Sequence, residues 1–301
     1  MATENRARFN NVQVPGLFVV AQEQFKRATN NLKKVVTMRS STKEYEEAGY
    51  ITGLGYLQSK PEGTPISGDA RIQGPVKRWT HSPWALMVRI TREAIDDDRY
   101  GFMTGAKRDL GISAAATSHL LMARLIMTGT ATTYHTAGDG YAIFYDSHTK
   151  LGGGTWDNLG DAADPTEASI GAAVLNFESI TDHRGKRYDQ KAKGILAGPT
   201  HEMVLEKVLE STLEPESNRN AVNALKRRRG LELVIDKEIT DGRWVVYGDK
   251  DPDVGMIHFD RIKPTMSRAG DPDTGDAKFY VYTRFSDEAN DPRQVYLVPA
   301  L

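Results

Sequence analysis

Hydrophobic and polar positions follow two periods in the first third of the chain. Between residues 18 and 35, apolar side chains recur every three or four positions, which predicts an amphipathic helix. Its apolar stripe consists of Phe18, Ala21, Phe25, Ala28, Leu32 and Val35. Further along, large apolar residues recur at every second position. This second pattern places Trp84, Leu86, Val88 and Ile90 on one face of a predicted strand.

Residues 50–90 are rich in glycine and proline. Two β-prone runs, Tyr50–Gln58 and Trp84–Ile90, flank the irregular part, so we predict a long two-stranded excursion with an irregular tip. A lone hairpin is marginally stable in water. We therefore expect this one to lie on another part of the structure or on a neighbouring molecule.

Residues 91–129 have a helical pattern that glycines interrupt. Gly101, Gly105 and Gly111 weaken its middle, and Ser113 is predicted to cap a strong helix from Ala114 to Met127. That second helix is apolar almost all round. We expect it to be buried on several sides.

The rest of the chain alternates between strands and helices. Asp164 as N-cap and Pro165 at the first position begin a helix with the stripe Ile170, Val174, Phe177 and Ile180. A second helix is predicted over residues 201–211, with Val204, Leu205, Val208 and Leu209 facing inward. Predicted strands are Ala142–Tyr145, Gly194–Ala197, Leu231–Ile235, Trp244–Tyr247, Gly255–Phe259, Lys278–Phe285 and Gln294–Pro299. The predicted fold class is α+β.

Composition adds a constraint on shape. Only 39% of the 301 residues are apolar, below the usual 45–50%, which favours an extended subunit or one completed by neighbours. The net charge of -1 argues against a dedicated nucleic-acid-binding protein, although the first 43 residues carry +6 and the last 72 carry -5. No run reaches the ~18 apolar residues of a membrane helix, and the N-terminus lacks the apolar core of a signal peptide.

Candidate chemistry is sparse. The absence of cysteine excludes disulfides, thiolate metal sites and a cysteine nucleophile, and it fits a reducing compartment. The glycine run 152–154 lacks the residues of a phosphate-binding loop, and Asp96-Asp97-Asp98 lacks the spacing of a calcium loop. His148 after Asp146, and His183 after Asp182, remain candidates for a metal ligand or a base. We predict no active site, no metal and no cofactor.

Basic residues gather in two places that could contact phosphate or acidic groups of a neighbouring subunit. One is the polar face of the first predicted helix, and the other is a dense run after residue 225. The candidates are Lys26, Arg27, Lys33, Lys34, Lys226, Arg227, Arg228 and Arg229.

The order of four segments is informative. They are Ile90–Gly101, Asp139–Phe144 followed by His148, Gly194–Pro199 before the helix with Glu202, and Asn223–Leu225 followed by Trp244–Asp249. Together they make the chain resemble the major capsid proteins of tailed phages, which have the Hong Kong 97 type of fold. The resemblance is closest to the Mu-like major head subunits.

This resemblance implies a division of the chain. Residues 1–48 would form the N-terminal arm, residues 49–90 the extended loop, and residues 91–159 the peripheral domain with its spine helix. Residues 160–252 would form the axial domain, and residues 253–301 would return to the peripheral domain. The extended loop would lie on an adjacent subunit, and its candidate contact residues are Lys60, Pro61, Glu62, Arg71, Lys77 and Arg78.

The resemblance also implies a function. The protein would assemble as pentamers and hexamers into an icosahedral shell around packaged double-stranded DNA, with assembly in the host cytoplasm and a final place in the virion. Implied partners are a separate scaffolding protein, or else a processed precursor, together with a portal protein and a decoration protein. Lys60 and Lys77 lie in the loop but match no crosslinking chemistry, so we predict no covalent crosslink. Alternatives are an encapsulin-like compartment, a metal-dependent hydrolase using His148 or His183, and a DNA-binding module at 226–229.

Overall fold

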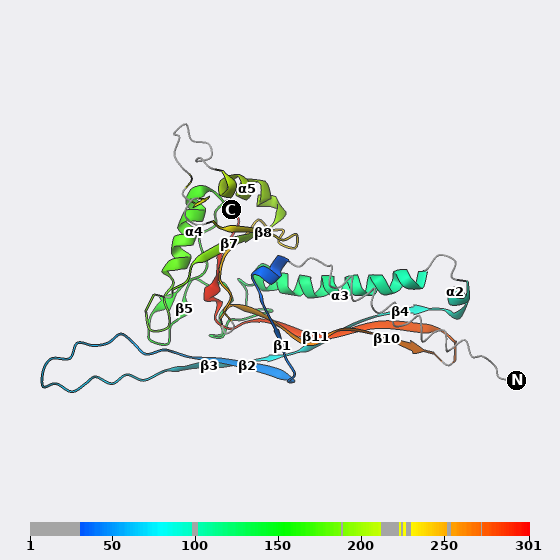
Figure 1. Ribbon diagram of the computed structural model, residues 1–301, viewed down its shortest axis with the longest axis horizontal. Coiled ribbons are helices and arrows are strands. Elements are labelled where there is room, and N and C mark those ends of the chain that lie inside the picture. The colour runs from blue at the N-terminus through cyan, green and yellow to red at the C-terminus, as the bar shows by residue number, and fades with distance from the viewer. Residues whose placement is uncertain are drawn as a thin grey trace.

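The computed structural model describes residues 31–97, 102–187, 189–211, 223, 225–226, 230–251, 254–271 and 273–301. It contains an elongated arm of sheet and helix, a wedge-shaped domain at one end of that arm, and a hairpin that projects beyond both (Figure 1). This mixed architecture confirms the predicted α+β class. The predicted helix over residues 18–35 lies mostly outside the described residues, but its last part forms the short 3₁₀ helix η1 (Asn31–Lys34).

The elongated arm is built on a four-stranded sheet. In this sheet β1 (Thr37–Ser40) runs parallel to β10 (Met256–Gly270), and the other neighbouring strands are antiparallel. The long helix α3 (Phe102–Met127) lies along the sheet, and the short helix α2 (Arg92–Asp96) lies at its far end (Figure 1). The strand order is β1 (Thr37–Ser40), β10 (Met256–Gly270), β11 (Ala277–Ala289) and β4 (Ser82–Ile90).

Alternate residues of this sheet form a core with α3. Ile90, Phe279 and Val281 pack against Leu110 and Ala114, and all five are buried. The strand predicted to end at Ile90 is confirmed, but its predicted apolar face is covered only at Val88 and Ile90, because Trp84 and Leu86 are 38% and 49% exposed. The opposite face of the sheet leaves Met87 and Tyr280 at 54% and 37% exposure, so this chain covers the sheet mainly on one side.

The wedge-shaped domain holds a second sheet and two helices. α4 (Glu167–Ser179) and α5 (Glu202–Glu210) cover it, and the short 3₁₀ helix η2 (Pro199–His201) leads into α5. The predicted stripe of α4 is buried throughout. The strand order is β12 (Val295–Val298), β9 (Trp244–Gly248), β7 (Ala192–Ala197) and β8 (Glu232–Ile235). These four strands confirm four of the seven strands predicted between residues 142 and 299.

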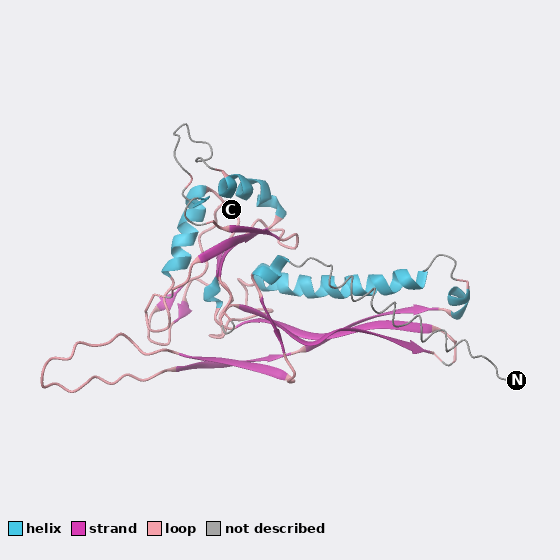
Figure 2. Cartoon of the chain, viewed as in Figure 1, coloured by secondary structure: helices cyan, strands magenta, loops and turns pink. Residues whose placement is uncertain are grey.

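The projecting hairpin pairs β2 (Tyr45–Ile51) with β3 (Gln73–Thr80). β3 passes through His81 into β4, so the hairpin and the elongated sheet share one long run of extended chain. Residues 52–72 contain no strand, and they continue far beyond the paired part (Figure 2). Two small elements complete the fold: the pair β5 (His148–Thr149) with β6 (Thr155–Trp156), and the 3₁₀ helix η3 (Pro292–Gln294).

Several predicted boundaries were wrong. The first hairpin strand is Tyr45–Ile51, not Tyr50–Gln58, because the glycine-rich run after Ile51 has no partner strand. The second hairpin strand is Gln73–Thr80, not Trp84–Ile90, because Trp84–Ile90 pairs with β11 in the elongated sheet. Ser113 does not cap a helix, since α3 is continuous through Gly105 and Gly111. Packing of α3 along the sheet outweighs the cost of about 1 kcal/mol for each glycine.

Three further details also differ. Residues Ala142–Tyr145 form no strand, although Ile143 and Phe144 are buried as core. Thr166, not Asp164, caps α4, because its side chain accepts a hydrogen bond from the Ser169 amide. Val204 on α5 is 46% exposed rather than inward.

The last two long strands exceed their predicted lengths. β10 has 15 residues and β11 has 13, and the two form an antiparallel ribbon interrupted by register shifts near Ile262. Gly105–Met127 of α3 is long and apolar enough to span a membrane by length and composition, contrary to the sequence-based expectation. In this fold that stretch packs on the sheet as the central helix of the arm.

Candidate assembly surfaces

The loop at the end of the hairpin exposes an unusual number of large apolar side chains. Leu57 is fully exposed, and Ile66 and Tyr56 are exposed by 81% and 67%. Ile51, Leu54 and Val76 add to this surface at 65%, 49% and 55%. Surfaces of this kind mark sites of interaction between proteins.

The root of this loop is anchored, although its end is not. The Arg184 guanidinium donates to the Asp69 carboxylate at 3.1 Å and to the backbone carbonyls of Gly53 and Ala70. Asp69 also accepts a hydrogen bond from the Gly55 amide at 2.6 Å. The Arg184 contacts therefore fix the direction in which the loop leaves the body.

The structure separates the six predicted loop residues into two groups. Lys60, Pro61, Glu62 and Arg71 lie in the exposed loop, where Pro61 and Thr64 form a turn. Lys77 and Arg78 lie on β3 and are engaged within the chain. Their partners are Glu288 at 3.2 Å for Lys77, and Glu47 at 2.7 Å together with the Tyr45 ring for Arg78.

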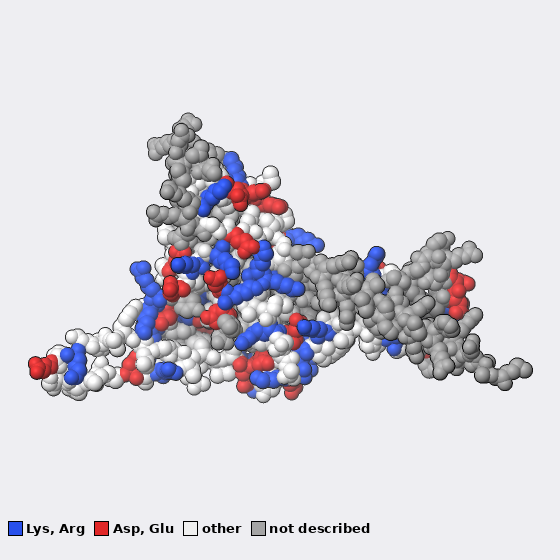
Figure 3. Space-filling view, viewed as in Figure 1, with Lys and Arg blue, Asp and Glu red and all other residues white. Residues whose placement is uncertain are grey.

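The predicted basic residues are only partly described. Lys26, Arg27, Arg227, Arg228 and Arg229 lie outside the described residues. Lys34 pairs with Glu232 at 2.5 Å, Lys226 lies 3.8 Å from Glu210, and Lys33 is exposed. Figure 3 shows both signs of charge interleaved over the body, and both signs also occur near the end of the hairpin. The described part of this basic set is therefore largely balanced by acids.

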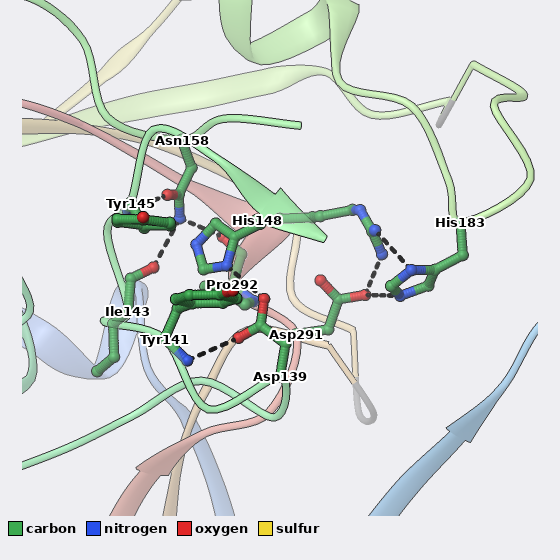
Figure 4. A network of polar contacts seen from close by, with 10 residues as sticks. Asp139, Tyr141, Ile143, Tyr145, His148, Asn158, His183, Asp291 and Pro292 are labelled. Carbon is green, nitrogen blue, oxygen red and sulfur yellow. Dashed lines mark hydrogen bonds and ion pairs between the residues drawn. The ribbon is translucent and has the colours of Figure 1, made fainter. Parts of the chain in front are cut away.

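A buried polar network joins the root of the hairpin to the body (Figure 4). We call it the polar hub, and it consists of Asp139, His148, His183, Asp291 and Arg293. His148 bonds Asp139 at 2.7 Å, not Asp146, and its ring stacks on Trp156 with 4.4 Å between centroids. Asp182 does not orient the ring of His183. Instead, its carboxylate accepts hydrogen bonds from the backbone amides of Arg184 and Lys186 in a turn.

His183 is the member of the polar hub that meets the hairpin. Its ring stacks on Tyr50 of β2 with 4.4 Å between centroids. Its Nδ1 lies 3.2 Å from a guanidinium nitrogen of Arg293, and its Nε2 lies 3.8 Å from Asp291. Burial, reinforced by the charge of Arg293, lowers the pKa of His183 to about 4. His183 is therefore neutral at pH 7 and accepts a hydrogen bond from Arg293.

Arg293 is the charged centre of the polar hub. It is 2% exposed, pairs with Asp291 and lies 4.5 Å from the centroid of the Trp156 ring. Burial raises the pKa of Asp291, and Arg293 opposes that shift. The two predicted histidine sites therefore converge on one ion-paired network. No group of three or more metal-ligating side chains occurs among the residues that the structure describes.

A second buried charge lies between β10 and β11, at a histidine for which no role was predicted. His258 is 1% exposed and contacts Asp287 at 2.6 Å and Asp260 at 3.1 Å. Burial alone would lower the pKa of His258, but the two carboxylates outweigh it and raise the pKa to about 9. His258 is thus a cation at neutral pH and holds two acids in the sheet.

We expect the stability of the subunit to depend on pH through His258. A folded-state pKa above the unfolded value gives stability that is full below pH 6.5 and is lost as pH rises through about 9. A shift of this size corresponds to roughly 3 kcal/mol. Urea unfolding of unassembled subunits between pH 6 and 10 measures the loss.

The matched control is His258→Gln, and the quantity of interest is its difference from the wild type at each pH. Burial lowers the pKa of Lys107 to about 8, which makes stability rise at higher pH and opposes the effect of His258. Because both proteins contain Lys107, the difference removes that contribution. A constant difference from pH 6 to 10 would contradict the assignment.

The fold and these surfaces define an elongated shell subunit with a projecting hairpin, and comparisons with known proteins agree. A TM-score of 0.61 relates the chain to the capsid of a native GTA particle, at 12% identity and 91% coverage of both chains. The chain is also similar to the virus-like particle from Pyrococcus furiosus, with a TM-score of 0.59 and 11% sequence identity. This match covers 94% of this chain and 98% of that one. A structure from Microbacterium phage Oxtober96 has a TM-score of 0.57 to this chain at 9% sequence identity, and the match covers 91% of both chains. These likenesses confirm the Hong Kong 97-like capsid fold.

The family model for phage capsid protein matches residues 76–298, and the chain belongs to that family. No curated protein sequence matches it. The chain is therefore a phage major capsid protein, a structural component of the virion whose copies assemble into a shell. The family match favours this function over the encapsulin-like alternative.

Proposed function

We propose that this chain assembles as pentamers and hexamers into an icosahedral shell that encloses packaged double-stranded DNA. The proposal is supported mainly by the hairpin loop, which projects from the body (Figure 1). The loop carries the exposed apolar residues Leu57, Ile66 and Tyr56. Burial of one such side chain against a neighbour contributes roughly 1.5–3 kcal/mol. In a shell, every subunit would gain this contribution.

The division of the chain follows from the same proposal. The hairpin and its loop act as the extended loop, the sheet with α3 as the peripheral domain, and the domain with α4 and α5 as the axial domain. The stretch assigned to the N-terminal arm, residues 1–48, includes β1 and the start of β2. Loop residues Lys60, Pro61, Glu62 and Arg71 are the proposed contacts with an adjacent subunit.

The remaining proposed partners are proteins that would help to build the closed shell and to fill it with DNA. We propose a separate scaffolding protein, a portal protein, a decoration protein and assembly in the host cytoplasm. We also propose that the protein has no enzymatic activity and closest kinship to Mu-like head subunits. The basic front segment would contact DNA without sequence preference, and such contacts weaken steeply with salt.

Electron microscopy of the expressed full-length chain, together with sedimentation, tests the proposal. We expect closed particles of uniform size that contain both fivefold and sixfold clusters. Subunits that remain monomeric under every assembly condition would overturn it. Particles that enclose a protein cargo in place of DNA would favour the encapsulin-like alternative.

A further inference from the structure

A cavity of about 320 Å³ opens between the C-terminal part of α3 and β4, which is an outer strand of its sheet. Residues of β3, β4, α3, the segment after α3, and β11 line it. No residue of the hairpin loop or of the polar hub belongs to this lining. Pockets of roughly 300 Å³ and more are typical of sites for small molecules.

Two exposed aromatic side chains line this cavity. They are Trp84, which is 38% exposed, and Tyr134, which is 60% exposed. Phe285 stacks against Trp84 with 6.1 Å between ring centroids, so the indole is supported from within the chain. Exposed aromatic faces are stacking surfaces for planar rings. The cavity is therefore suited to a ligand that contains an aromatic ring.

Arg124 gives the cavity a positive charge that no acid balances among the residues that the structure describes. The two acids in the lining already have cationic partners. Asp287 contacts His258 at 2.6 Å, and Glu288 contacts Lys77 at 3.2 Å. Because a guanidinium binds carboxylate and phosphate groups through charge-assisted hydrogen bonds, the remaining charge favours an anionic ligand.

The cation and an aromatic surface are adjacent in this cavity. The guanidinium carbon of Arg124 lies 5.3 Å from the centroid of the Tyr134 ring. Burial lowers the pKa of His135, which also lines the cavity, so this histidine is neutral at pH 7 and adds no charge. The side-chain hydroxyls of Thr80 and Ser82 have no hydrogen-bond partner within the described part of the chain, so they can bind a polar group of a ligand.

We propose that this cavity binds a small ligand in which a planar aromatic ring carries an anionic group, as in a nucleoside monophosphate. The ring stacks on Trp84 or Tyr134, and the phosphate accepts hydrogen bonds from Arg124. The hydroxyls of Thr80 and Ser82 pair with those of the sugar. Binding requires the folded subunit but not the shell, so this inference can fail while the shell function stands.

Titration of the full-length chain with adenosine monophosphate tests the site, with calorimetry and tryptophan fluorescence as the two measurements. The other three tryptophans, Trp79, Trp156 and Trp244, are 2%, 6% and 0% exposed, so quenching on binding should come from Trp84. Trp84→Phe is expected to keep the heat of binding and to lose the quenching. Adenosine and ribose 5-phosphate each lack one half of the ligand and are expected to bind about tenfold more weakly or worse.

Two matched charge variants complete the test. Arg124→Met is expected to weaken adenosine monophosphate about tenfold or more and to leave adenosine unchanged, because only the phosphate contacts Arg124. Arg108→Met removes another cation of α3 that does not line the cavity, and it should change neither affinity. Equal affinity for inorganic phosphate and adenosine monophosphate, or no binding of the nucleotide at millimolar concentration, would overturn the inference. Affinity for single-stranded DNA that rises with strand length would overturn it in favour of a nucleic-acid surface.

Discussion

Replacing Arg293 by methionine is expected to destabilise the subunit by about 3–5 kcal/mol, which is a large fraction of the stability of a typical domain. The guanidinium is 2% exposed, and it balances the buried carboxylate of Asp291. It also lies over the Trp156 ring and donates to His183. Methionine fills similar space but leaves the Asp291 charge without a counterion in a site that water does not reach.

A double-mutant cycle separates the lost charge pair from lost packing. Asp291→Asn alone should also destabilise the protein, because it leaves Arg293 as the unpaired charge. The double variant Arg293→Met with Asp291→Asn should recover part of the loss, since no buried charge then remains. Urea unfolding of unassembled subunits measures all four proteins. A cost below about 1 kcal/mol for Arg293→Met would show that the pair is solvated and that the polar hub is not a buried network.

Shortening the hairpin loop is expected to abolish shells and leave the subunit folded. Replacing residues 56–68 by a two-residue Asn-Gly turn removes Leu57, Ile66 and Tyr56. It keeps the Gly55–Asp69 hydrogen bond and the contacts of Arg184. Because the deleted side chains are mostly exposed in the subunit, its free energy of unfolding should change by less than about 1 kcal/mol.

Particle formation, measured by sedimentation and electron microscopy, gives the result. The matched point variants are Leu57→Asp, which should impair assembly, and Leu57→Met, which should assemble normally. Closed shells of wild-type size from the shortened chain would contradict the role of the loop. Loss of subunit folding would show that the loop stabilises its own chain.

The two histidines that the sequence singled out illustrate what local pattern can and cannot reveal. Their neighbours in sequence, Asp146 and Asp182, are not their partners. His148 pairs with Asp139, and His183 contacts Arg293, which lies 110 positions away. A hydrogen-bond partner depends on which segments the fold brings together, so residue type alone could not identify it. His258 has one acid, Asp260, two positions away on the same strand, but its closer partner Asp287 approaches only when β10 and β11 pair.

The exposed loop is a different case, in which the sequence predicted the role but not the geometry. Glycine and proline between residues 50 and 90 indicated an excursion with few core residues, and the structure contains one. The strand boundaries were wrong because Tyr45–Ile51 is held by its register with Gln73–Thr80, not by its own composition. A groove of about 560 Å³ beside β2 could not be predicted at all, since residues from five separate segments line it.

The sequence by itself determined the features that depend on local residue patterns or on overall composition. The buried stripe of α4 follows from helical periodicity, and the strands β7, β9 and β12 follow from short continuous apolar runs. The low apolar content correctly indicated an extended subunit. The tertiary structure alone decided the continuity of α3, the polar hub, the charged state of His258 and the groove at the hairpin root. Each of these depends on contacts between distant segments, and the free energy of such contacts overrides local preference.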